Sequence, residues 1–391
     1  MTVSMRILLS LTYYRPHVSG LTIYAERLAR SLVANGHRVT VLTSRHDPAL
    51  PVDDMVDGVR VVRSPVAVSV GKGPLMPQFG PTAIRLLRHH DVASLHLPQV
   101  ESTLVAGPAK AMGIPVVLTY HCDLDLPPGR LNGGIGRVVD AANHLSGRLA
   151  DAVVAYTEDY ANHSPFLQRW ASKRKVIGPP VVMPSPSPDE VAAFRTRYKL
   201  EPGPVLGFAS RFATQKGIEY AIDAAPRLIR DFPDLRIVFA GPYENVVGEA
   251  AYRERLAPAV KALGDHWLFI GTLTQTELPA FFGSLDMLLM TSVNSTESFG
   301  LVQVEAMLCG TPCVTTNLPG VRQPVITTGM GEIVDVADSA SLERGVRAVL
   351  ANPSAYVRPR ASIEALYDPA ITVAGYESLF QRLVDQKRRA A

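Results

Sequence analysis

The 391-residue sequence predicts an α/β protein built from two doubly wound parallel-sheet domains in tandem. Short runs rich in Val, Ile and Leu alternate with longer segments of helical period, the pattern of buried parallel strands joined by crossover helices. This pattern runs twice, on either side of the proline-rich segment 178–188. The length also suits about two domains, at roughly 100 to 200 residues each.

The first half contains six predicted strands. They span residues 5–11, 38–43, 59–63, 92–97, 116–120 and 152–156. Helical patterns separate them, as in residues 21–34, where the apolar residues share one face and Gly36 supplies a stop.

Segment 178–188 can form neither a helix nor a central strand, because its prolines lack the backbone donors that both need. The elements predicted after it are strands 205–209, 236–240, 267–270, 287–291 and 313–316 and helices 217–230, 275–282 and 301–309. A last amphipathic stretch covers residues 371–384. We therefore expect a first domain over 1–185, a second over 186–370, and a final segment 371–391 whose helix packs back across the linker.

Composition excludes several classes of protein. The 39 basic and 36 acidic residues give a net charge of +3, too small for a protein that neutralises a nucleic-acid backbone. Basic residues exceed acidic ones by 19 to 13 over residues 1–185, which favours an anionic surface or acceptor, although ordinary scatter of solvated charge explains it equally well. Three cysteines are too few for a disulfide framework, and no apolar stretch reaches about 18 residues, so a cytoplasmic protein without a membrane span is expected.

Loops that follow parallel strands are where open α/β sheets bind ligands. In the first such loop, Gly20 allows close backbone approach at a helix N-terminus, which suits an anion or a sugar hydroxyl; a plain tight turn is the alternative. His121 directly follows the fifth predicted strand and is expected at the mouth of a cleft, although a lone histidine is more often structural. Asp123 and Asp125 form a D-x-D pair too short to predict a metal site.

The loop after strand 205–209 carries two cations. Arg211 and Lys216 lie beside a helix that begins at Gly217. A guanidinium fork, a mobile ammonium and a helix dipole together predict a diphosphate site, with solvated surface charge as the alternative.

The sequence TSVNSTESFGLVQVEAMLCGTP is the most informative. Glu297 lies in a loop after a strand, and Glu305 lies in a short helix among apolar neighbours. A buried carboxylate needs donors, which a ribose diol would supply; the alternative is a basic partner in the core. The first N–H groups of that helix, around residues 299–302, are expected to be free for phosphate or sugar oxygens.

Together these motifs resemble family 4 of the retaining glycosyltransferases, which have the GT-B architecture. The ESFGLVQVE element followed by AM-L-CGTP is the most specific match, and the S-R-F-x-x-x-K-G loop, the P-x-x-S-G loop and the T-Y-H strand end agree with it. The chain departs from the family pattern at Ser19 and Ser210, where glycine is usual, and at Gln323, where glutamate is common.

The resemblance implies two facing Rossmann-like domains, with the acceptor held mainly by the first and a nucleotide-sugar donor by the second. Arg211 and Lys216 match the family's diphosphate ligands, Glu305 the carboxylate on the ribose, Glu297 the residue near the donor sugar, and His121 the histidine beside the reacting centre. The catalytic residues implied are His121, Glu297, Arg211 and Lys216. The donor-binding residues implied are Gly20, Arg211, Lys216, Glu297, Ser298, Phe299, Gly300, Leu301, Val302 and Glu305. No metal or other cofactor is implied.

The expected activity is retaining transfer of a hexose-type sugar from GDP-mannose or a UDP-sugar to an acceptor hydroxyl. A membrane glycolipid or a cell-envelope polysaccharide precursor is the expected acceptor, with a soluble sugar or a natural-product aglycone as the alternative. Peripheral contact is expected at the anionic inner face of the cytoplasmic membrane, and no nucleic-acid partner is expected. Two alternatives remain open at this stage: another GT-B enzyme, such as a nucleotide-sugar epimerase or a phosphorylase, and a noncatalytic nucleotide-sugar-binding subunit.

Overall fold

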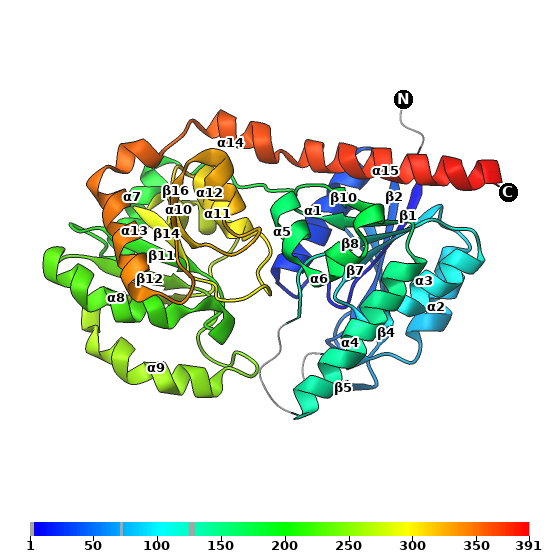
Figure 1. The fold of residues 1–391 in the computed structure, drawn as a ribbon, viewed down its shortest axis with the longest axis horizontal. Coiled ribbons are helices and arrows are strands. Elements are labelled where there is room, and N and C mark those ends of the chain that lie inside the picture. Colours follow the sequence, from blue (N-terminus) through cyan, green and yellow to red (C-terminus); the bar gives the residue numbers. More distant parts are fainter. Residues whose placement is uncertain (1–3, 71–72, 125–129, 391) are drawn as a thin grey trace. The chain divides into compact units, whose positions relative to one another are not determined.

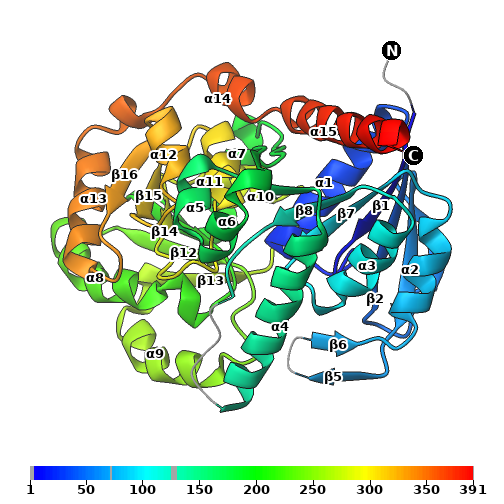
Figure 2. The same cartoon turned by 45° about the vertical axis from the view of Figure 1, so that its right-hand side comes forward.

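The computed structural model describes residues 4–70, 73–124 and 130–390. Contacts divide the chain into two compact units: unit 1 comprises Met1–Pro180 and Tyr367–Ala391, and unit 2 comprises Val181–Leu366. Each unit has a largely parallel sheet joined by helices (Figures 1 and 2). The predicted fold class, two doubly wound α/β domains, is therefore confirmed.

Unit 1 is built on an eight-stranded sheet in the order β10-β9-β8-β7-β1-β2-β4-β3. Its strands are β1 (Arg6–Ser10), β2 (Arg38–Arg45), β3 (Asp53–Val56), β4 (Val59–Pro65), β7 (Val92–Leu97), β8 (Val116–Tyr120), β9 (Ala152–Ala155) and β10 (Arg174–Val176). Only β3 runs antiparallel to its neighbour in this sheet. A separate hairpin of β5 (Val68–Val70) and β6 (Gly73–Leu75) lies apart from it (Figure 2).

The helices of unit 1 include the last one in the chain. They are α1 (Gly20–Ala34), α2 (Phe79–Leu87), α3 (Thr103–Ala111), α4 (Arg130–Leu149), α5 (Glu158–His163), α6 (Pro165–Arg169) and α15 (Pro369–Ala390), with a short 3-10 helix η1 at Val100–Ser102. The α15 helix lies beside α1 (Figure 1). The Tyr376 hydroxyl of α15 is 2.7 Å from the Tyr24 hydroxyl of α1 and 2.7 Å from the Thr119 hydroxyl of β8. These buried contacts fasten the terminal helix to unit 1.

Unit 2 has a six-stranded sheet, all parallel, in the order β13-β12-β11-β14-β15-β16. Its strands are β11 (Val205–Ala209), β12 (Arg236–Ala240), β13 (Trp267–Gly271), β14 (Met287–Met290), β15 (Cys313–Thr316) and β16 (Gly331–Val334). Its helices are α7 (Pro188–Tyr198), α8 (Ile218–Asp231), α9 (Ala250–Ala262), α10 (Leu278–Gly283), α11 (Leu301–Leu308), α12 (Gln323–Thr328), α13 (Ser339–Ala351) and α14 (Arg360–Tyr367).

Some boundaries differ from the prediction. The α10 helix begins three residues later than expected, because Thr274 and Glu277 form a hydrogen-bonded turn in front of it. The α15 helix is longer at both ends than the predicted stretch 371–384. The α9 helix was not predicted: only Tyr252 and Leu256 are buried in it, so its apolar stripe is thin.

The order of strands reverses at one point in each sheet. In unit 2 this switch point lies between β11 and β14, and in unit 1 it lies between β1 and β7. Loops that leave two such strands diverge to opposite faces of the sheet and open a crevice between them, where ligands bind in folds of this type. Among the described residues, no helix combines the length and the apolar character that crossing a bilayer requires.

Candidate active site

The loops that follow β11 and β14 are tied together at the switch point of unit 2. The Val293 N–H donates to the Gln215 carbonyl at 3.0 Å, and the Thr291 hydroxyl donates to the Lys216 carbonyl at 2.7 Å. Gly217 has φ +57°, and a Cβ there would lie 2.3 Å from the Thr291 carbonyl oxygen. Glycine is therefore required for the two loops to approach this closely.

Lys216 and Glu297 meet across these two loops. The Lys216 Nζ is 2.6 Å from the Glu297 Oε2, and both side chains are largely buried. The other oxygen, Glu297 Oε1, accepts from the Gly300 N–H at 3.0 Å. The structure thus brings two predicted site residues into direct contact, in a place where the backbone also supplies a donor.

The α11 helix begins at this point. Its N-cap residue is Gly300, with φ +76°, which has no side chain to accept a hydrogen bond from the first N–H groups of the helix. Ser298 and Phe299 just before it are buried, and Leu301 and Val302 are half-buried. The expectation that all N–H groups around residues 299–302 are free is wrong for Gly300, because the Glu297 carboxylate accepts from it.

Glu305 lies inside α11 and is 6% exposed, as its apolar neighbours predict. The next buried polar residue on this helix, Gln303, donates to the carbonyls of Phe299 and Val321 at 3.0 and 2.9 Å. Gln303 therefore anchors the loop before the helix. Glu305 is the buried acidic residue of α11.

Arg211 is exposed in the loop after β11 and forms no ion pair with any described residue. The rest of that loop is held by Glu249, which is 8% exposed. One oxygen of Glu249 accepts from the backbone N–H and the hydroxyl of Thr214, at 2.9 and 2.7 Å. Thr214 opens the short turn that ends at Lys216, so Glu249 positions the turn that carries the ammonium group.

His121 directly follows β8 in unit 1, and its side chain is buried. Its place at the mouth of a cleft stays a prediction. Its Nε2 is 2.9 Å from the Nδ1 of His96, and its Nδ1 forms a short hydrogen bond with the Tyr156 hydroxyl. Burial, followed by the charge of His96, lowers the pKa of His121 well below its usual value. Burial alone lowers the pKa of His96 to about 3. Both imidazoles are therefore neutral near pH 7.

Asp123 is engaged by the protein itself. Its carboxylate accepts from the hydroxyls of Tyr120 and Tyr160 at 3.0 Å each and from Ser164 at 2.8 Å. Asp125 lies outside the described residues. Among the residues that are described, no cluster of three or more His, Cys, Asp or Glu is arranged to hold a metal ion.

Gly20 begins α1, where the Ser19 hydroxyl accepts from the Thr22 N–H at 3.2 Å. A Cβ at Gly20 would meet no atom within 4 Å, so packing within the protein does not require glycine here. Its role in ligand approach stays a prediction.

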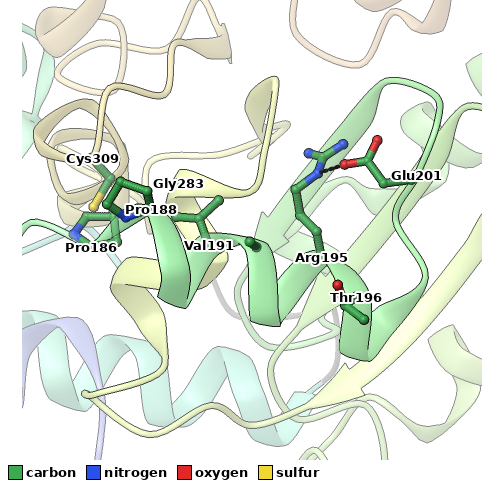
Figure 3. A pocket seen from close by; sticks show the side chains of 9 residues that line it. Pro186, Pro188, Val191, Arg195, Thr196, Glu201, Gly283 and Cys309 are labelled. Atoms are coloured by element: carbon green, nitrogen blue, oxygen red, sulfur yellow. Dashed lines mark hydrogen bonds and ion pairs between the residues drawn. The ribbon is translucent and has the colours of Figure 1, made fainter.

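A surface pocket in unit 2 lies away from the predicted donor-site residues. It is lined by α7 together with Gly283 and Cys309, and Arg195 pairs with Glu201 at its edge at 2.5 Å (Figure 3). No residue predicted to bind the donor lines this pocket, and we assign it no role in the chemistry.

The chain is similar to known proteins over most of its length. Residues 19–180 match the family model of the glycosyl transferase 4-like domain, and residues 192–365 match that of glycosyl transferases group 1. The 2-deoxystreptamine glucosyltransferase of Streptomyces kanamyceticus is 30% identical over 360 residues, covering 84% of this chain and 89% of that protein. The chain belongs to the family 4 glycosyltransferases.

Two further relatives of this glycosyltransferase act on different molecules. The glycogen synthase of Mycobacterium tuberculosis is 28% identical over 390 residues, covering 90% of this chain and 88% of that protein. The GDP-mannose-dependent α-(1-6)-phosphatidylinositol monomannoside mannosyltransferase of Mycolicibacterium smegmatis is 27% identical over 354 residues, covering 87% and 88%. Family membership therefore does not select one acceptor.

Solved structures agree with the fold of the glycosyltransferase. Anabaena Alr3699/HepE in complex with UDP aligns with a TM-score of 0.76 at 20% identity, over 97% of this chain and all of that one. Sucrose-phosphate synthase from Thermosynechococcus elongatus aligns with a TM-score of 0.78 at 19% identity, over 98% of this chain and all of that one. These alignments establish the GT-B fold.

Several residues that contact the predicted site residues or their loops carry no signal in the sequence. Glu249, His96 and Tyr156 lie far along the chain from the residues that they hold, and none sits in a motif. Only the positions of His96 and Tyr156, near the ends of β7 and β9, could have drawn attention to them, whereas Glu249 directly precedes α9.

Proposed function

We propose that this glycosyltransferase transfers a hexose-type sugar from a nucleoside diphosphate sugar to an acceptor hydroxyl, with retention of configuration and without a metal ion. One observation carries the proposal: the switch point of unit 2 gathers the Lys216–Glu297 pair, the loop of Arg211 and the start of α11. Cations beside a helix N-terminus suit a diphosphate. Relatives that use GDP-mannose or that bind UDP support the donor class.

The proposed site stabilises the leaving group. As the bond from the anomeric carbon to the phosphate oxygen breaks, negative charge grows on the diphosphate. In this proposal Lys216 and Arg211 neutralise it, and preorganised groups of this kind lower an activation barrier by several kcal/mol. Lys216 exchanges its Glu297 partner for phosphate, and Glu297 then accepts from a hydroxyl of the donor sugar. Glu305 accepts from the ribose hydroxyls.

Retention follows in this proposal from reaction on one face of the sugar. The acceptor oxygen bonds to the anomeric carbon on the side that the phosphate leaves. The acceptor proton passes to the departing phosphate oxygen, so no protein nucleophile is used. His121 is held neutral by its buried surroundings, so its role in this scheme is to shape the site and not to deliver a charge.

The proposed acceptor is the hydroxyl of a glycan or of a membrane glycolipid. Relatives include enzymes named for aminocyclitol, glycogen and phosphatidylinositol acceptors. The excess of basic residues over residues 1–185 supports peripheral contact with an anionic membrane, as on the inner face of the cytoplasmic membrane. Lys387 in the basic end of α15 is partly used within unit 1, where it lies 3.2 Å from Asp151.

The test begins with donor binding. The purified protein is heated with UDP, GDP, ADP and dTDP and their sugars, with EDTA or with magnesium. A ligand that binds the folded state raises its melting temperature. We expect a shift selective for one base and equal in both buffers. No shift with any nucleotide would contradict the proposal.

The second step is turnover. With the selected donor, NMR of the product gives its anomeric configuration, and donor incubated alone tests for an epimerase or a phosphorylase. Lys216→Ala and Glu305→Ala should each lower kcat/KM by about 100-fold or more. The control Lys261→Ala removes an exposed ammonium from α9 and should leave kcat/KM unchanged. Full activity in both site variants would overturn the assignment of the site.

A further inference from the structure

Two buried polar residues follow β7 in unit 1. They are not part of the proposed donor site, which lies in unit 2. Gln99 is 1% exposed, and Glu101 in η1 is 7% exposed. The β7 strand borders β1, so both residues follow a strand at the switch point of this sheet; Figure 2 labels the two strands. They therefore occupy the place in unit 1 that corresponds to the donor-site loops in unit 2.

Glu101 lacks a cationic partner in the part of the chain that the structure describes. No Lys, Arg or His among the described residues forms an ion pair with it, and the hydrogen bond that its carboxylate receives comes from its own backbone N–H. Burial raises the pKa of Glu101. An unpaired carboxylate in such surroundings is costly to keep, and a ligand that donates hydrogen bonds or carries a positive charge would offset that cost.

Gln99 supplies a complementary donor. Its Oε1 accepts from the Ser10 hydroxyl at the end of β1, at 3.0 Å, and this bond fixes the orientation of the amide. Its buried Nε2 has no hydrogen-bond partner among the described residues. Among the described residues, a buried amide donor without a partner thus lies two residues from a buried carboxylate whose hydrogen bond comes from its own backbone N–H.

Flat rings line the same edge of the sheet. Tyr13 and His17, after β1, stack with ring centroids 4.6 Å apart, and His46, after β2, lies 5.6 Å from Tyr13. Burial, followed by the charge of Glu101, raises the pKa of Tyr13, which is consistent with Glu101 lying near this ring. Half-buried ring faces, together with the Gln99 amide donor and the Glu101 carboxylate acceptor, suit a polyhydroxylated ring. The negative charge of Glu101 would repel a phosphate group bound directly to it.

We propose that Glu101 and Gln99 form the acceptor subsite and hold a cyclic polyol, with an amine-bearing ring preferred over a neutral one. The inference rests on the proposed function, because it assigns the acceptor of that reaction. A ring amine or hydroxyl donates to the Glu101 carboxylate, and the Gln99 amide donates to a neighbouring ring oxygen. The ring can come from a free aminocyclitol or from an inositol lipid headgroup.

The experiment measures transfer to 2-deoxystreptamine, to myo-inositol and to phosphatidylinositol in vesicles, with donor hydrolysis recorded in parallel. In the unaltered protein we expect the lowest KM for 2-deoxystreptamine. Glu101→Gln should raise that KM by about tenfold or more and remove the preference for the amine. Donor KM and donor hydrolysis should stay unchanged. Gln99→Met should raise KM for all of the ring acceptors.

Glu158→Gln is the matched control, because its side chain is 62% exposed and pairs with Arg174 at the surface. It should change no acceptor KM. If Glu101 has only a structural role, Glu101→Gln will change the melting temperature and leave acceptor KM as it was, and the inference fails. It also fails if a protein that hydrolyses donor transfers to none of these rings. Loss of donor binding and hydrolysis in the unaltered protein would instead contradict the proposed function.

Discussion

Lys216 and Glu297 form the central ion pair of the proposed donor site. The two side chains are 18% and 22% exposed, so the ion pair is partly shielded from solvent and each group neutralises the charge of the other. A diphosphate has to compete with Glu297 for Lys216. The carboxylate therefore weakens binding of a bare nucleotide, while in the proposed mechanism it holds the sugar.

Replacing Glu297→Gln separates these two effects. Loss of the competing charge should tighten binding of the nucleoside diphosphate by about fivefold, the scale of a partly exposed ion pair. The rate of transfer should fall, because a neutral amide is a weaker acceptor for a sugar hydroxyl. Calorimetric titration and steady-state kinetics give the two numbers. Weaker nucleotide binding in the variant would show that Glu297 does not compete.

The buried His96–His121 pair should make the free energy of unfolding depend on pH. The pKa of each imidazole is lowered on folding, to about 3 for His96, whereas an unfolded histidine titrates near 6.5. Below about pH 6.5 the unfolded chain therefore binds protons that the folded chain excludes, so the free energy of unfolding falls as pH falls. The loss is about 1.4 kcal/mol per pH unit for each histidine.

Urea unfolding at about pH 7 and pH 5.5 measures this loss, in a range above the titration of most carboxylates. His96→Asn should make the free energy of unfolding less dependent on pH across that interval. An unchanged slope would mean that His96 is protonated in the folded protein.

At the scale of the element, the turn that ends at Lys216 depends on its glycine. In Gly217→Ala, the added Cβ would lie 2.3 Å from the Thr291 carbonyl at a positive φ, so the two loops must separate. We expect a loss of about 1–3 kcal/mol in stability and a larger loss in donor affinity. Gly107→Ala is the control: it lies in α3, its Cβ meets nothing within 4 Å, and it should keep or raise stability. Wild-type donor affinity in Gly217→Ala would show that the loops can part freely.

The contacts of the α15 helix should stabilise unit 1. Tyr376→Phe removes a buried hydroxyl that contacts both Tyr24 and Thr119. The cost should be about 1–3 kcal/mol, because two partners lose a buried hydrogen bond. Hydrogen exchange should speed up in α1, β8 and α15, all in unit 1, and stay unchanged in unit 2. Equal acceleration in both units would contradict a local role for this helix.

For the molecule as a whole, the basic excess of residues 1–185 predicts binding to anionic vesicles that is strongest at low salt. Sedimentation with vesicles of anionic and of neutral lipid, over a series of salt concentrations, measures it. Binding that is absent at low salt, or equal for both lipids, would contradict peripheral membrane contact. Lys387→Ala removes a residue already paired with Asp151 and should change it little.

The sequence was informative wherever the deciding contacts are local. Apolar periodicity located β1, β7 and β11 closely, and apolar neighbours predicted the burial of Glu305. It was least informative where partners are distant. Tyr156 lies 35 residues from His121, and Glu249 lies 35 residues from Thr214, and no local pattern announces either pair. The ion pair of Lys216 with Glu297 likewise depends on β11 and β14 being neighbours, which composition and spacing do not encode.

Unit 1 is made of two stretches of chain, since Tyr367–Ala391 returns to it after the whole of unit 2. During synthesis, the ribosome releases residues 181–366 before it releases Tyr376, whose hydroxyl contacts Tyr24 and Thr119. The second domain made can therefore finish folding first, while the first waits with the apolar face of α1 uncovered. A stall or truncation late in translation would leave a nascent chain with one complete domain and one that chaperones must shield.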